Sequence, residues 1–273
     1  MQKLLVFTDI HIVPDGADII GLDPMARFHQ GLDHALATHP DATRIIITGD
    51  LAHHGANEEY IRLKSALAEC PLPVSLLIGN HDNRARFRET FADVPIDDGG
   101  FIQSFQDVDD YRLVFLDTVD ETAEIAHSGF LCAARMDWLD RVLTEAGGRR
   151  VIVFMHHPPI TSGFDAMDRI GLRNRAEVAA RLKAHPNVCQ LVAGHVHRTI
   201  SGSACGIPTA VFKSPCHQMP MVLVHEDEHL SVDEPGAYGL LLLTDEGVIV
   251  HTEDFNLPPH DVISYATPKE TAA

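Results

Sequence analysis

The fold of this chain is most constrained by short apolar runs that alternate with segments of helical periodicity. Six runs are short enough to be buried strands: Leu4–Thr8, Ile45–Thr48, Val74–Ile78, Leu113–Leu116, Val151–Met155 and Leu191–Ala193. Five segments between them have the apolar spacing of helices: Pro24–Thr38, Glu58–Ala68, Asp82–Phe91, Ala133–Ala146 and Asn174–Ala184. Strand–helix alternation of this kind predicts a layered α/β protein with its helices on the outside.

The pattern changes in the last quarter of the chain. Residues 214–238 are rich in proline, histidine and acidic residues and lack periodicity, which predicts an excursion or small cap. Leu240–Thr244 and Val248–Thr252 flank Asp245-Glu246-Gly247, which predicts a β-hairpin. We therefore divide the chain into a core at residues 1–213, a cap at 214–238, and a hairpin and tail at 239–273 that return to the core.

Charge and cysteine usage exclude several classes of partner. The net charge of −18 argues against a nucleic-acid polymer or an anionic membrane as partner, although bound metal ions can reverse the local sign. No apolar run approaches the roughly 20 residues that span a bilayer. The five cysteines show no metal-binding spacing, and the first residues lack an export signal. Reduced thiols in a cytoplasmic protein are the expectation.

Metal-ligating residue types follow five of the predicted strands. They are Asp9 and His11, Asp50, Asn80 with His81 and Asp82, His156 with His157, and His195 with His197. In an open α/β sheet the carboxyl ends of the strands form the edge where ligands bind. Each group alone could be a turn, and Asn80 or Asp82 could cap the following helix. All five together, in this order, predict a metal site.

The donor types narrow the choice of metal. Imidazole, carboxylate and amide oxygen suit manganese, iron, cobalt or zinc, and the lack of cysteine argues against a structural zinc or iron–sulfur site. Gly49, Gly79 and Gly194 each precede a candidate ligand. Glycine there is expected to allow unusual dihedral angles and close backbone approach.

The series Asp9-x-His11, Gly49-Asp50, Gly79-Asn80-His81-Asp82, His156 and Gly194-His195-x-His197 resembles the signature of the calcineurin-like metallophosphoesterases. The stretches His156–Pro159 and Met167–Asn174 more closely resemble bacterial class III cyclic nucleotide phosphodiesterases and their glycerophosphodiesterase relatives. The resemblance implies a metallophosphoesterase-type β-sandwich flanked by helices, with two divalent metal ions, Mn²⁺, Fe²⁺ or Zn²⁺, at one edge.

The resemblance also implies a ligand set. One ion would take Asp9, His11, Asp50 and His197, and the other Asp50, Asn80, His156 and His195, so that Asp50 bridges the pair. A bridging hydroxide between ions ~3.5–4 Å apart would attack phosphorus. Two dications outweigh two carboxylates and a hydroxide, which leaves a positive pocket for an anionic phosphodiester.

Other residues near these motifs receive different roles. We expect His81 to contact the phosphate and protonate the leaving alkoxide, since imidazole titrates near neutral pH; the alternative is that it only orients Asp50 or Asn80. Asp82 and Asp117 are expected to be supporting or structural. His53 and His54 are not expected to line the pocket. His157 is expected to pack against the prolines that follow it and not to bind metal.

The predicted function is hydrolysis of a small phosphodiester, with a 3′,5′-cyclic nucleotide such as cyclic AMP as the first candidate. Alternatives are a glycerophosphodiesterase or promiscuous phosphodiesterase or phosphomonoesterase, a protein phosphatase that would use Arg84 or Arg86, and a non-catalytic scaffold of the same fold. Met219 and 221–224 are too apolar to lie freely in water. We therefore expect the cap to cover the pocket mouth and to form a homodimer or larger homo-oligomer.

Overall fold

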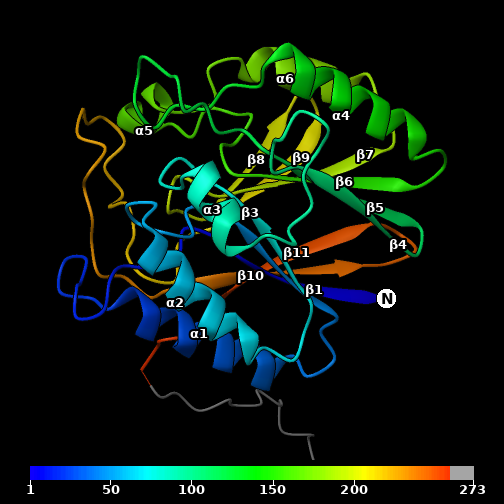
Figure 1. Cartoon of the computed structure of the whole chain (residues 1–273). Helices are drawn as coiled ribbons and strands as arrows, with labels where there is room; N and C mark the ends of the chain where they lie inside the picture. Colours follow the sequence, from blue (N-terminus) through cyan, green and yellow to red (C-terminus); the bar gives the residue numbers. More distant parts are fainter. Residues whose placement is uncertain (259–273) are drawn as a thin grey trace, which may run out of the picture.

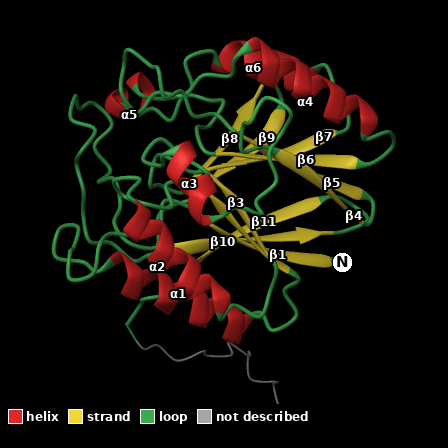
Figure 2. Ribbon diagram, in the orientation of Figure 1, coloured by secondary structure: helices red, strands yellow, loops and turns green. Residues whose placement is uncertain are grey.

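Two sheets packed face to face form the centre of the protein, and helices cover both outer faces, as the computed structural model of residues 1–258 shows (Figures 1 and 2). The first sheet has the order β11-β10-β1-β2-β3. Its strands are β1 (Gln2–Phe7), β2 (Arg44–Thr48), β3 (Val74–Leu77), β10 (Ala237–Leu243) and β11 (Val248–Asp254). The second sheet has the order β4-β5-β6-β7-β9-β8. Its strands are β4 (Ser104–Val108), β5 (Tyr111–Leu116), β6 (Arg150–Met155), β7 (Val188–Ala193), β8 (Ile200–Ala204) and β9 (Ile207–Val211).

The helices fall into two groups, one on each side of the sandwich (Figure 2). The helices on the side of the first sheet are α1 (Pro24–Thr38), α2 (Asn57–Ala68) and α3 (Arg84–Thr90). Those on the side of the second sheet are α4 (Ala133–Glu145), α5 (Asp165–Arg169) and α6 (Arg175–Lys183). Within residues 1–258, none of the helices is long and apolar enough to cross a membrane.

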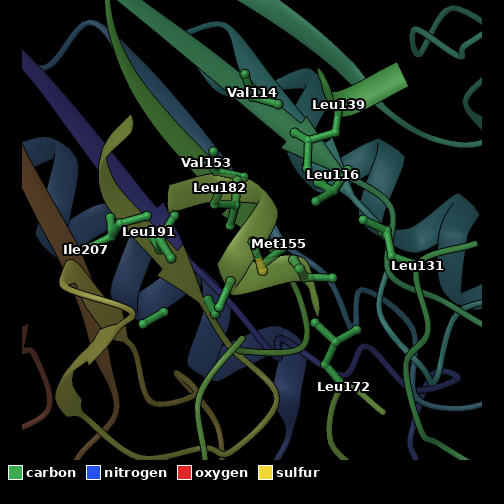
Figure 3. Packing of buried hydrophobic residues seen from close by; sticks show 14 of the residues in the cluster. Val114, Leu116, Leu131, Leu139, Val153, Met155, Leu172, Leu182, Leu191 and Ile207 are labelled. Atoms are coloured by element: carbon green, nitrogen blue, oxygen red, sulfur yellow. The ribbon is translucent and has the colours of Figure 1, made fainter. Parts of the chain in front are cut away.

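Three apolar layers result from this arrangement, because both faces of each sheet are covered. In β1, Leu4 and Val6 pack between the sheets, whereas Leu5 and Phe7 pack against the helices of the first sheet. The third layer lies between the second sheet and its helices, where Val153 and Leu191 pack with Leu139 of α4 and Leu182 of α6 (Figure 3). Strands buried on both faces appear in sequence as unbroken apolar runs, which is why they could be predicted.

The structure confirms the α/β class, the flanking helices and the C-terminal hairpin. The hairpin adds to the first sheet, because β10 pairs with β1 in antiparallel orientation. Four elements were not predicted: β4, β8, β9 and α5. Their sequences explain this, since β4 is an edge strand, β8 contains glycine and serine, β9 contains Pro208, and α5 has five residues.

The segment 214–238 is only partly an excursion. Residues 214–219 are buried in the core, with Met219 in the layer beneath α4 and α6, and residues 237–238 already belong to β10. Met221 and Val224 are 67% and 84% exposed, whereas Val222 and Leu223 are about half covered and the Leu223 carbonyl accepts a hydrogen bond from the Asp165 backbone N–H. The predicted tail from residue 259 lies outside the described residues.

Candidate metal centre

The candidate ligands come from loops that leave both sheets at the same edge. β1, β2 and β3 run parallel in one sheet, and β5, β6 and β7 run parallel in the other, so the loops after them meet. Five of the predicted ligands have positive φ angles between 46° and 72°: Asp9, His11, Asp50, His195 and His197. This left-handed conformation is costly for residues with a Cβ, and such strain is concentrated at functional sites.

The glycines before the ligands serve two different purposes. Gly49 has a φ of +103° and therefore provides the dihedral freedom that the sequence suggested. Gly79 and Gly194 are required for space instead, since a Cβ on Gly79 would collide with Asp50 and one on Gly194 with Thr8. After Gly194 the positive φ angle falls on the neighbouring ligand His195, whereas neither Gly79 nor Asn80 has one.

Asp9, His11, Asp50 and His197 form the first predicted group, and their ligand atoms lie within 4.8 Å of one another. The Nε2 atoms of His11 and His197 are 3.0 Å apart, and His197 Nε2 is 3.4 Å from Asp9 Oδ1. Two ligands each about 2.0–2.2 Å from one ion would have such a separation. Asp9 is held in place by the backbone N–H of His195 and by the Thr8 hydroxyl.

Asp50, Asn80, His156 and His195 form the second predicted group. Asn80 Oδ1 is 3.0 Å from His156 Nε2 and 2.8 Å from His195 Nδ1. Asp50 Oδ2 is 3.3 Å from His156 Nε2 and 3.6 Å from His11 Nε2, so one oxygen faces both groups. Asp50 Oδ1 accepts a hydrogen bond from the His81 backbone N–H. Asp50 therefore occupies the position that a bridging ligand requires.

Backbone carbonyl groups orient two of the histidines. His156 Nδ1 donates to the carbonyl of Thr48, and His197 Nδ1 donates to that of His217. A carbonyl can only accept, so Nδ1 carries a proton and Nε2 is the nitrogen directed into the cluster. Metal-binding histidines are typically held this way.

Burial and mutual charge shift the acidity of the whole cluster. Burial disfavours the charged form of Asp50, but the charges of His156 and His81 outweigh it and hold the pKa of Asp50 well below its usual range. Burial likewise opposes charging of His156, but Asp50 and Asp9 raise its pKa to about 9. Burial, followed by neighbouring histidines, lowers the pKa of His11 and of His195 well below 6.5. Ionised Asp50 and neutral His11 and His195 are the forms that bind metal, whereas His156 must release a proton for a metal to bind.

His81 lies at the edge of the cluster and contacts the His11 ring, with ring centroids 4.7 Å apart. Its Nδ1 donates to the carbonyl of His53 at 2.8 Å, which leaves Nε2 as the nitrogen that can meet a ligand. The expectation that His53 lies outside the pocket was wrong. The backbone N–H of His53 donates to the carbonyl of Ile12, and this brings the His53 ring against the rings of His11 and His81. His54 does lie outside, with its exposed side chain bonded to Glu59.

Asp82 supports the site without facing it. Its carboxylate accepts from the backbone N–H groups of Leu51, Ala52 and Gly79 and from the Tyr60 hydroxyl, and so ties the loop after β2 to the loop after β3. Asp117 does not line the pocket; its carboxylate accepts from Arg84 and from the backbone N–H groups of Ile102 and Val119.

His157 has no lone pair to offer a metal. Its Nε2 donates to the carbonyl of His127, and its Nδ1 is 2.8 Å from the Thr118 hydroxyl. Burial, followed by the charge of His156, lowers the pKa of His157 to about 3.

Besides His229 of the cap, His127 and His217 line the pocket and had no role in the sequence prediction. His217 lies beside His11 and His197, with ring centroids 5.2 and 4.6 Å away. His127 Nδ1 is 3.0 Å from the Asn80 amide nitrogen, which turns the amide oxygen toward His156 and His195. Neither follows a strand end directly, so the pattern that identified the ligands could not find them.

The pocket above the cluster has a volume of about 260 Å³, close to the lower limit of about 300 Å³ for typical ligand sites. Among the described residues, no arginine or lysine lines it. Arg84, the candidate phosphate clamp of a protein phosphatase, is bound instead to Asp117, Glu121 and the carbonyl of Val119. The described lining therefore offers a substrate no permanently charged side-chain cation, and positive charge here comes from bound metal or from a protonated histidine.

The donor set fits two metal ions. Two buried carboxylates, an amide oxygen and four imidazoles converge in two groups that share Asp50, and their lone pairs face one another at about 3 Å. Among the candidate ligands, the buried Nε2 of His195 has no hydrogen-bond partner in the described part of the chain, which is costly unless a cation binds there. Two helix-covered sheets with such a cluster at one edge define a dinuclear metal-dependent hydrolase.

Comparison with known proteins agrees with this class. Residues 2–199 match the model of the calcineurin-like phosphoesterase family. The chain is 39% identical over 93% of both sequences to a Rhodopseudomonas palustris protein named "probable cyclic nucleotide phosphodiesterase". It is 28% identical, over 89% of this chain and 86% of the other, to the 3′,5′-cyclic adenosine monophosphate phosphodiesterase CpdA of Pseudomonas aeruginosa. A dimetal phosphatase from Danio rerio has the same fold, with a TM-score of 0.69, 16% identity, and coverage of 93% of this chain and 99% of that one.

The chain belongs to the calcineurin-like phosphoesterase family, as the resemblance of its motifs indicated. It is a metal-dependent phosphodiesterase, and the predicted sandwich fold is confirmed.

Proposed function

We propose that this enzyme hydrolyses a 3′,5′-cyclic nucleotide, with cyclic AMP as the first candidate. The observation that carries the proposal is a small pocket with no arginine or lysine among its described lining residues. A phosphomonoester dianion carries more charge than a diester and is usually bound by such cations. A diester monoanion needs less compensation, which bound metals alone can supply. The names of two relatives point to the same substrate class.

The proposed ligands are those of the sequence prediction. Asp9, His11, Asp50 and His197 would hold one ion; Asp50, Asn80, His156 and His195 would hold the other. When bound, two divalent ions supply an ionised water at neutral pH and neutralise the charge on the phosphate oxygens. We favour Mn²⁺, Fe²⁺ or Zn²⁺, because the donors are imidazoles and carboxylates.

His81 is the proposed general acid. Because the carbonyl of His53 fixes its Nδ1 proton, only Nε2 can transfer a proton to a substrate. Protonation of the leaving 3′ oxygen would therefore require the doubly protonated ring. The ring contacts with His11, His53 and His127 hold it at the mouth of the pocket.

The rest of the prediction concerns assembly. We propose that residues 214–238 form a cap in which His217, Met219 and residues 228–231 border the pocket, while the exposed apolar stretch 221–224 forms a homodimer or larger homo-oligomer interface. We further propose a cytoplasmic location, which the unpaired cysteines support.

Steady-state kinetics test the substrate. The Mn²⁺-loaded enzyme would be compared on cyclic AMP, glycerophosphocholine and 4-nitrophenyl phosphate, with kcat/KM measured for each. Cyclic AMP should be the best of the three. A higher kcat/KM for glycerophosphocholine would make the enzyme a glycerophosphodiesterase, and a higher value for the monoester would refute the argument from the missing cations.

A further inference from the structure

The pocket has a second half that the phosphoryl chemistry does not use. Besides the imidazoles, its lining includes apolar side chains from three separate segments: Ile20 before α1, Met167 and Ile170 at α5, and Met219 and Leu230 of the cap, where Glu228, His229 and Ser231 also line it. In Figure 1 these segments, the blue loop, the green α5 and the orange cap, lie on the same side of the molecule. Phosphate, ribose and glycerol are polar and gain little from such a surface.

Most of this apolar surface is rigid. Met167, Ile170 and Met219 belong to the core layer beneath α4 and α6, and Leu230 packs against the same layer. The cap is fastened to α5 by Arg169, which binds Glu228 and the carbonyl of Glu226. The surface is therefore formed before any ligand arrives.

Ile20 is the exception, and its backbone is strained. Ile19 and Leu22 exchange two backbone hydrogen bonds of 2.9 Å around a two-residue turn in which Ile20 has a φ of 50° and Gly21 a φ of 80°. Asparagine or glycine normally occupies that first position, and a β-branched residue is disfavoured there. The side chain is 51% exposed, so packing does not explain the isoleucine. Strained residues of this kind are typical of ligand clamps.

We propose that the apolar half of the pocket binds the nucleobase of the substrate and that Ile20 closes over the base. A base is flat and largely apolar on both faces, so it buries well between aliphatic side chains, whereas the glycerol of a glycerophosphodiester does not. The pocket joins the base and the phosphate in one cavity, next to the candidate ligands. This inference rests on the proposed cyclic nucleotide function and names the residues that would select the substrate.

Calorimetric titration of the Mn²⁺-loaded protein with 5′-AMP and with ribose 5-phosphate tests the subsite, because these ligands differ only by the base. The wild-type protein should bind 5′-AMP at least about tenfold more tightly than ribose 5-phosphate. Ile20→Asn removes the apolar side chain and suits the turn, so the variant should fold. The substitution should weaken the affinity for 5′-AMP roughly threefold to thirtyfold and change the affinity for ribose 5-phosphate by less than about twofold.

Leu230→Ser tests the opposite segment and should act in the same way as Ile20→Asn. Ile61→Asn is the matched control, since Ile61 is 57% exposed on α2 and outside this pocket, and both affinities should stay unchanged. Equal affinity of wild type for the two ligands, or equal weakening of both by Ile20→Asn, would overturn the subsite. The cyclic AMP assay is separate: base-dependent binding without cyclic AMP hydrolysis would refute the proposed function and retain a nucleotide site.

Discussion

In the metal-free protein, one buried histidine should lose its stabilising contribution as the pH rises from neutral towards about 9. The group responsible is His156, which is fully buried 3.3 Å from Asp50. Burial lowers the pKa of its ring, but Asp50 and then Asp9 overcome this and raise it from 6.5 to about 9. Between these two values the folded state binds a proton that the unfolded state has released. The stabilisation is therefore complete below pH 6.5 and is lost as the pH rises through about 9.

The magnitude follows from the same two values. A difference of about 2.5 pH units, at roughly 1.4 kcal/mol per unit, corresponds to about 3 kcal/mol of unfolding free energy. The slope should approach about 1.4 kcal/mol per pH unit near pH 8. His197 adds to the slope, because Asp9 outweighs burial there and raises its pKa as well.

Urea unfolding of chelator-treated protein between pH 6.5 and 9 measures this slope. In the His156→Gln variant the slope should be smaller by the contribution of one proton, about 1.4 kcal/mol per pH unit, and the remaining slope should be that of His197. With metal bound, the wild-type slope should vanish or reverse, because metal ligation needs the neutral imidazole. Equal slopes for wild type and His156→Gln in the metal-free state would show that His156 is not charged in the folded protein.

Further substitutions test the remaining roles. Asp50→Ala should abolish turnover and remove more than one metal equivalent by elemental analysis; retention of both metals with full activity would contradict a bridging role. His81→Ala keeps the backbone N–H that Asp50 accepts, so metal content should stay near normal while turnover of cyclic AMP falls roughly 10²–10⁴-fold. The loss should be smaller with a nitrophenolate leaving group, and equal losses would indicate phosphate binding. Val224→Lys should reduce the mass measured by light scattering, and an unchanged mass would make 221–224 an ordinary surface loop. Gly194→Ala should lower thermal stability and metal content, because its Cβ has no space, whereas Gly148→Ala, in open space, should change neither.

The sequence was sufficient for the parts of the fold that are buried on both sides. β1, β2, β5, β6 and β7 are continuous apolar runs because each has a core layer on both faces. The edge strands of the second sheet, β4 and β8, each pair in antiparallel orientation and lack this continuous apolar run. β8, for example, pairs only with β9, to which a Cys205-Gly206 turn joins it, and β9 in turn depends on parallel pairing with β7, a tertiary contact that local composition does not encode.

For the site, the strand-end pattern located the residues that the structure brings together, but not those that surround them. His127 and His217 reach the pocket through loops, and loop paths depend on contacts distant in sequence. His53 was missed for the same reason, since a backbone hydrogen bond to Ile12 sets its direction. The histidine content of the chain signalled that extra rings could gather, without indicating which ones.

The distribution of the candidate ligands between two sheets has a consequence for biosynthesis. Asp9, Asp50 and Asn80 leave the ribosome early, whereas His156 and His195 follow only after most of the second sheet has been made. Contacts such as that from the His195 backbone to Asp9 span 186 residues and close only when the sheets have docked. The nascent chain therefore cannot capture a full complement of ions, so metal uptake should be a late, post-translational event that stabilises an already packed sandwich.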